Sequence, residues 1–229
     1  MRFMSALFAV GMVFLLSGDL FAQDDDEIVE KDLLEVAVFG GAAIPVGGLS
    51  DWTSTNELGV TDLGAKTGFD VGFDVGLFLT SKLSLGVNFT FSQFTIDTDS
   101  VEAASLNHRI FSPGLYLKYF FSGESNFVPY LKGGVGVDVA KFTTRVRDVN
   151  SNSFVYRELS YDPAVSVSAG AGLFYYTHDY GGLFLEASYR NGFAEDTNGG
   201  FQSSEFTFGE QISVVDVHAG IVVFFGADE

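Results

Sequence analysis

The sequence predicts an all-β fold, an eight-stranded antiparallel up-and-down transmembrane β-barrel with short turns at one end and long loops at the other. Three observations lead to this prediction. Apolar residues alternate with small or polar residues along eight segments, which is the period of a strand with two different faces. Most of these segments exceed the usual strand length of about five or six residues. The connections between them are short and long in turn.

The second segment shows the alternation most clearly, because Phe69, Val71 and Phe73 share one face while Asp70 and Gly72 share the other. Gly and Asp are poor helix formers, so a helix is not expected here. In chain order, the alternation is carried by Val36 and Val38, Phe69 and Val71, Leu83 and Leu85, Leu115 and Leu117, Val135 and Val137, Val165 and Val167, Leu183 and Leu185, and Val215 and Val217. The strands are expected at residues 33–46, 68–79, 83–96, 108–121, 128–143, 164–176, 182–190 and 212–225.

The connections fix which ends of these strands lie together. Residues 80–82, 122–127 and 177–181 are short connections, whereas 47–67, 97–107, 144–163 and 191–211 are long and rich in Ser, Thr, Asn and Asp. Tilted strands of about 9–11 residues cross a bilayer, and short periplasmic turns with longer outer loops are typical of outer-membrane barrels. A sheet in hydrocarbon cannot leave an open edge, so the first and eighth strands are expected to pair antiparallel.

The less apolar face of the strands separates a membrane barrel from a soluble one. A soluble barrel would place many Lys and Glu on its outer face. Here that face carries small residues, among them Gly72, Gly76, Gly86, Gly134, Gly172, Ser84, Ser112 and Ser166. The bulky face would overfill a narrow lumen, so it is expected to contact lipid. Aromatic residues at 119–121, 127, 130, 175, 176, 180, 184, 224 and 225, and at 91, 94, 111, 142 and 189, are expected to form two interfacial girdles.

Composition excludes several classes of protein. The 229 residues include no Cys, which excludes disulfides and thiol chemistry, and carry a formal net charge of −18, which disfavours nucleic-acid binding. Residues 1–22 have the order of a secretory signal peptide: a positive start, an apolar run and a small residue at Ala22. We expect cleavage there, an acidic periplasmic tail over residues 23–32 and an outer-membrane barrel over residues 33–226.

Three segments resemble the small eight-stranded outer-membrane barrel proteins, the OmpA/OmpX-like and opacity-protein-like group. Residues 40–47 are similar to the first strand of that family, and residues 128–136 to its fifth. The last strand resembles the barrel-assembly signal, with His218, Gly220, Val223 and Phe225 at the matching positions, although four residues follow Phe225 here. The resemblance implies a location in the outer membrane of a Gram-negative-type bacterium, with outer-membrane lipid and the barrel-assembly machinery as partners.

The predicted lumen face also carries charged residues. Buried charges must be paired or hydrated, and Lys118, Lys132 and Glu186 lie within reach of one another across a narrow barrel, so we expect a polar network that closes the lumen. Its members are Glu35, Asp70, Asp74, Lys118, Lys132, Asp138, Glu186, Arg190, Asp216 and His218. Asp216 and His218 lie two residues apart on one face, which could indicate an acid–base pair but favours a hydrogen-bonded lumen pair. No catalytic residue, cofactor or metal site is expected.

The long loops are acidic. Their acids are Asp51, Glu57, Asp62, Asp97, Asp99, Glu102, Asp148, Glu158, Asp162, Glu195, Asp196, Glu205 and Glu210. They could bind divalent cations or a basic extracellular ligand or protein, or form a solvated repulsive surface, which the pattern favours. The expected function is a structural or surface-interaction role without enzymatic activity. A narrow channel for ions or small solutes is the first alternative, and a lipid-modifying barrel enzyme is the second.

Overall fold

The structure is a computed structural model that describes the strands of the chain and the connections next to them. The described residues are 34–50, 53–56, 59–62, 64–96, 107–121, 126–147, 154–160, 163–178, 180–193, 205–207 and 211–226. The predicted signal peptide and acidic tail, over residues 1–32, lie outside the described residues, and so do the side chains of the acids in the long loops. No helix among the described residues is long and apolar enough to cross a membrane.

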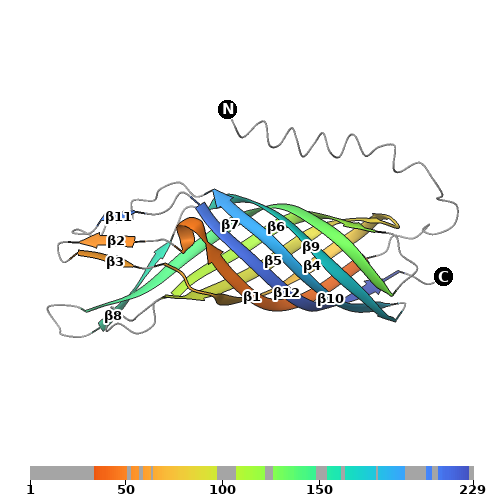
Figure 1. The fold of residues 1–229 in the computed structure, drawn as a ribbon, viewed down its shortest axis with the longest axis horizontal. Coiled ribbons are helices and arrows are strands. Elements are labelled where there is room, and N and C mark those ends of the chain that lie inside the picture. The colour runs from red at the N-terminus through yellow and green to blue at the C-terminus, as the bar shows by residue number, and fades with distance from the viewer. Residues whose placement is uncertain are drawn as a thin grey trace, which may run out of the picture. The chain divides into compact units, whose positions relative to one another are not determined.

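Eight long strands form the main sheet (Figure 1). They are β1 (Leu34–Val46), β4 (Gly68–Thr80), β5 (Leu83–Thr95), β6 (Asn107–Phe120), β7 (Phe127–Arg147), β9 (Ala164–His178), β10 (Gly181–Phe193) and β12 (Gln211–Phe225). Each begins within one residue of its predicted start, and β7 and β10 end later than predicted. At about 3.3 Å per residue, a strand of 13 residues such as β4 extends about 43 Å, and a tilt of about 45° reduces this to the 30 Å of a hydrocarbon core.

The sheet closes on itself as the argument about open edges predicted. Every neighbouring pair of long strands is antiparallel, in the order β6-β5-β4-β1-β12-β10-β9-β7, and β6 also pairs with β7. The first strand pairs with the last along the whole length of β1, from Leu34 opposite Phe225 to Val46 opposite Ser213. The chain is therefore a closed eight-stranded up-and-down barrel.

The two faces of the barrel differ sharply in composition. The large exposed hydrophobic residues include Val38, Phe73, Leu115, Val135 and Ile221, and they occur on every long strand. The opposite face is buried and carries the charged residues, with Asp70 1% and Asp138 0% exposed. A water-soluble surface rarely exposes so much contiguous apolar area, and this arrangement is the one that a lipid-facing barrel requires.

Aromatic residues correct one prediction. Phe121, Phe127, Tyr175, Tyr180 and Phe225 are exposed near the short turns, as a girdle requires. Other residues assigned to the girdles point into the lumen and are buried, which the alternation of a strand dictates for neighbours of outward residues. These buried residues are Phe94, Phe120, Tyr130, Phe142 and Phe224.

The buried apolar residues form two clusters inside the barrel, one at each end. The turn-end plug consists of Ala37, Phe120, Tyr130, Phe174, Val222 and Phe224. The loop-end plug consists of Ala43, Leu49, Ala65, Phe94, Ile96, Ile110, Ala140, Phe142, Ile212 and Val214. Leu49 belongs to a short 3₁₀ helix, η2 (Gly47–Leu49), which follows β1 directly. The lumen is thus layered, with apolar plugs on both sides of a charged middle.

Three of the long connections contain short strands that the sequence did not predict. β2 (Thr53–Asn56), β3 (Gly59–Asp62) and β11 (Glu205–Thr207) form a separate three-stranded sheet. β8 (Phe154–Ser160) pairs with the end of β7, which continues past the predicted boundary to Arg147. These segments show no sustained alternation of apolar and polar residues, so their sequences are typical of loops.

Candidate functional site

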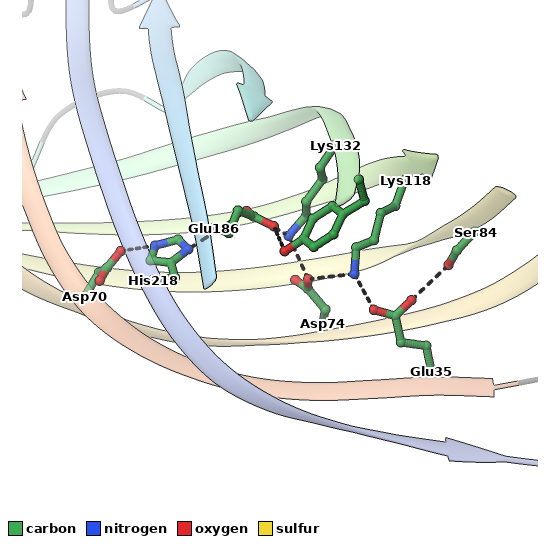
Figure 2. Close-up of polar contacts among 9 residues, drawn as sticks. Glu35, Asp70, Asp74, Ser84, Lys118, Lys132, Glu186 and His218 are labelled. Atoms are coloured by element: carbon green, nitrogen blue, oxygen red, sulfur yellow. Dashed lines mark hydrogen bonds and ion pairs between the residues drawn. The ribbon is translucent and has the colours of Figure 1, made fainter. Parts of the chain in front are cut away.

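The charged middle of the lumen is the candidate site, and its first half is built around two lysines. Lys118 on β6 donates a hydrogen bond to Glu35 on β1, and its ammonium lies 3.9 Å from Asp74 on β4. Lys132 on β7 donates to Asp74 at 2.6 Å and lies 3.5 Å from Glu186 on β10. The two lysines are direct neighbours across the β6–β7 pair, so the carboxylates between them offset their mutual repulsion (Figure 2).

Aromatic side chains surround both ammonium groups. Lys132 lies 4.9 Å from the ring centre of Tyr116, and Lys118 lies 5.2 Å from the same ring and 5.3 Å from that of Tyr130. Tyr130 also donates a hydrogen bond of 2.9 Å to Glu186. Cation–π contacts and charge-assisted hydrogen bonds are strongest where water is absent, so these rings hold the lysines in place and fill the lumen around them.

The second half of the network is built around Arg190 on β10. Its guanidinium donates to the hydroxyls of Ser112 and, at 3.1 Å, Ser92. It also donates to Asp138 at 3.3 Å, and its Nε lies 3.7 Å from Asp216. The planar fork of Arg suits such simultaneous contacts with several strands. Arg190 therefore ties β5, β6, β7 and β12 to β10 across the lumen.

His218 on β12 extends the network from Glu186 to Asp70. Its Nε2 contacts Asp70 on β4, its Nδ1 lies 4.0 Å from Glu186, and its ring stacks on Phe39 with 4.6 Å between centres. Figure 2 shows His218 between Asp70 and Glu186. The sequence suggested a pair of Asp216 with His218, but the imidazole of His218 is hydrogen-bonded to Asp70, which lies two strands away.

All ten residues that the sequence placed in the lumen network lie inside the barrel. Each acidic side chain lies within 4.0 Å of a basic one, and each basic side chain within 4.0 Å of an acidic one. The alternation of the strands was sufficient to place them on this face. Sequence reasoning missed the neutral partners Phe39, Tyr116 and Ser92, because pattern alone does not show which strands lie opposite each other. The residues of the suggested assembly signal lie on both faces of β12, with His218 inward and Phe225 outward.

Glycines on the lumen face make room for the large side chains. A Cβ atom at Gly86 would lie 2.6 Å from Cζ of Tyr116, and one at Gly220 would lie 2.6 Å from Cε1 of Phe184. At Gly172 a Cβ atom would overlap the ring of Tyr130. Large and small residues thus alternate across the lumen, which is how a narrow barrel reaches the density of a packed core.

This packing gives a first prediction. Gly172→Ala is expected to lower the free energy of unfolding by about 1–3 kcal/mol, since it forces the buried Tyr130 ring aside. Urea unfolding in detergent micelles, followed by gel mobility, measures the change. Gly133→Ala is the control, because its nearest contact would be the Ser168 carbonyl at 4.0 Å. Adding Tyr130→Ala should make Gly172→Ala nearly neutral, and strictly additive effects would contradict the proposed packing.

The sequence and the structure of the chain were compared with those of known proteins. No family model and no curated protein matches the sequence. Among solved structures, the outer membrane protein OprG from Pseudomonas aeruginosa matches with 15% sequence identity and a TM-score of 0.50, over 86% of this chain and 98% of OprG. The chain has the fold of an outer-membrane β-barrel. Neisserial surface protein A also matches, with 16% identity and a TM-score of 0.46 over 84% of this chain and 97% of that protein.

Proposed function

We propose that the chain is an integral outer-membrane β-barrel with a structural or surface-interaction role, closed to solutes, whose long loops face the cell exterior. The observation that carries this proposal is the filled lumen: a charged network in the middle and an apolar plug at each end. A conducting barrel needs a continuous hydrated path, and outer-membrane barrels of eight strands have room only for side chains.

The lipid-facing surface supports the location. Apolar side chains cover the outer face of all eight long strands, so the barrel would expose an extensive apolar surface in water. Aromatic residues at the short turns, such as Phe127 and Tyr180, stand where an interfacial girdle belongs. The predicted signal peptide supplies the export route, and the OprG-like fold agrees with this destination.

Two of the histidines are not placed to act as bases on a lipid substrate. His218 is 4% exposed and held between carboxylates, and His108 is 2% exposed and stacked on Phe142 at 4.7 Å between ring centres. A hydrolase needs its base within reach of a substrate, and both imidazoles are enclosed by the barrel. The proposal therefore excludes a lipid-modifying activity based on these two histidines.

Two measurements test the proposal. Protein extracted from outer membranes should migrate faster on an unheated gel than after boiling, because a closed barrel resists detergent denaturation. Reconstituted in planar bilayers, it should leave the conductance at baseline. A mature chain that stays monomeric in water without detergent would overturn the membrane assignment, whereas steady single-channel currents would overturn the closed lumen and favour the narrow channel.

A further inference from the structure

Three potential metal ligands meet in the charged middle of the lumen, although no metal site was expected from the sequence. One ligand atom each from Asp70, Asp216 and His218 lies within 4.8 Å of the others, and all three residues are buried. Asp70 belongs to β4 and the other two to β12, which are not adjacent strands. Gly41 on β1 lies between them, opposite Asp70 on one side and His218 on the other. A Cβ atom at Gly41 would lie 1.9 Å from the backbone oxygen of Val217, so a glycine here lets β1 and β12 approach closely.

Both carboxylates among the three ligands have an oxygen atom with no hydrogen-bond partner. Oδ1 of Asp70 and Oδ1 of Asp216 are buried and accept no hydrogen bond, while the residues are 1% and 3% exposed. Buried polar atoms in folded proteins nearly always have a partner, and an orphaned carboxylate oxygen calls for an explanation such as a bound ion. This observation is independent of the spacing of the three ligands.

The charge of the lumen points the same way. Among the described residues, the network contains six carboxylates, Glu35, Asp70, Asp74, Asp138, Glu186 and Asp216, but three permanent cations, Lys118, Lys132 and Arg190. Apolar plugs at both ends separate these groups from solvent. Uncompensated buried charge is costly, so a sealed lumen with an excess of carboxylates requires additional positive charge.

We propose that Asp70, Asp216 and His218 bind one divalent transition-metal ion. Zn²⁺ is the ion used to test for binding at this site. An imidazole with two carboxylates suits zinc and its neighbours in the first transition series, whereas Ca²⁺ and Mg²⁺ prefer oxygen ligands alone. Glu186 is not one of the three ligands, but its carboxylate lies 4.0 Å from Nδ1 of His218, on the side from which a carboxylate orients a metal-bound imidazole. The ion has a structural role, because it reduces the excess negative charge of the lumen.

The position of the site determines how the ion enters. Both plugs must be in place in the finished barrel, so the metal is captured while the barrel closes and is released slowly afterwards. Arg190, whose Nε lies 3.7 Å from Asp216, competes with the ion for that carboxylate. The site should therefore retain Zn²⁺ through an EDTA wash when the metal is present during folding. Ions on the acidic loops should be removed by the same wash.

The test refolds the full chain into detergent micelles with either equimolar ZnCl₂ or EDTA, then washes both samples with EDTA. The wild type refolded with zinc should retain about one Zn²⁺ per chain by elemental mass spectrometry. Measured before the wash, with free ZnCl₂ at about a hundred times the Kd, its thermal midpoint should exceed that of the EDTA sample by roughly 5–10 °C.

Asp216→Asn and Asp70→Asn should each abolish zinc retention and the zinc-dependent shift. Asp138→Asn is the matched control, since Asp138 is equally buried, also contacts Arg190 and also has an unpartnered oxygen, yet lies outside the three ligands. It should retain the metal. Loss of zinc from Asp138→Asn as complete as from Asp216→Asn would overturn the site, as would a wild type that retains no zinc. Identical midpoints with and without zinc would mean that protons neutralise the lumen, which also overturns the proposal.

Discussion

Replacing Lys132 by Met is expected to lower the free energy of unfolding by about 3–5 kcal/mol, the cost of removing one partner of a buried ion pair. Met is an unbranched side chain of similar volume that carries no charge. Asp74, which is 1% exposed, then has Lys118 at 3.9 Å as its neighbouring cation, and Glu186 loses an ion pair of 3.5 Å. The lumen, already rich in carboxylates, becomes more negative. Urea unfolding of the barrel in micelles, followed by heat-modifiable gel mobility, measures the loss.

The control for this change is Lys141→Met on the same strand. Lys141 is exposed, so its replacement should alter the free energy of unfolding by less than about 0.5 kcal/mol. The Lys132→Met barrel should still leave planar bilayers at baseline conductance, because both apolar plugs remain in place. A stability equal to the wild type would show that the ion pairs of Lys132 do not form as described. A new steady current would show that the network alone closes the lumen.

The strands and the faces of this barrel could be predicted from the sequence because lipid and lumen impose opposite demands on neighbouring residues. The adjacent residues Phe73 and Asp74 illustrate this, because Phe73 is 41% exposed on the outer face whereas Asp74 is buried in the lumen. The same logic placed Lys118 and Glu186 inside. Alternation does not show how far along the barrel axis a residue lies, or which residue faces it from another strand. Both depend on the register of the strands.

The misplaced aromatic residues have a different cause, because their clustering near strand ends was given more weight than the alternation that turns them inward. Phe120 and Phe224 occur among aromatic residues near strand ends and were predicted in a girdle, although both face the lumen and fill the turn-end plug. The meeting of Asp70 with His218 follows from β1 lying between β4 and β12, with Gly41 at the shared level. Asp70 and His218 are far apart in the chain, so no single segment of the sequence indicates that they meet.

Phe224→Ala tests the turn-end plug with a large expected effect. The Phe224 ring is 4% exposed and lies 5.7 Å from Phe174, 5.8 Å from Phe78 and 6.0 Å from Tyr176, between ring centres. Its truncation removes the apolar contacts and leaves a cavity among rigid strands that cannot collapse into it. The expected loss is about 3–5 kcal/mol in the free energy of unfolding, measured by urea titration of the barrel in micelles.

The neighbouring Phe225→Ala provides the contrast, because Phe225 is 52% exposed on the lipid-facing side and belongs to the predicted assembly signal. Its truncation should cost less stability once the barrel is folded, and it should reduce the amount of barrel that reaches the outer membrane in cells. Phe224→Ala should show the reverse pattern, with a lower urea midpoint in protein that has assembled. If both variants lost stability equally, the inward and outward faces of β12 would not differ at this level, and the turn-end plug would have to be abandoned.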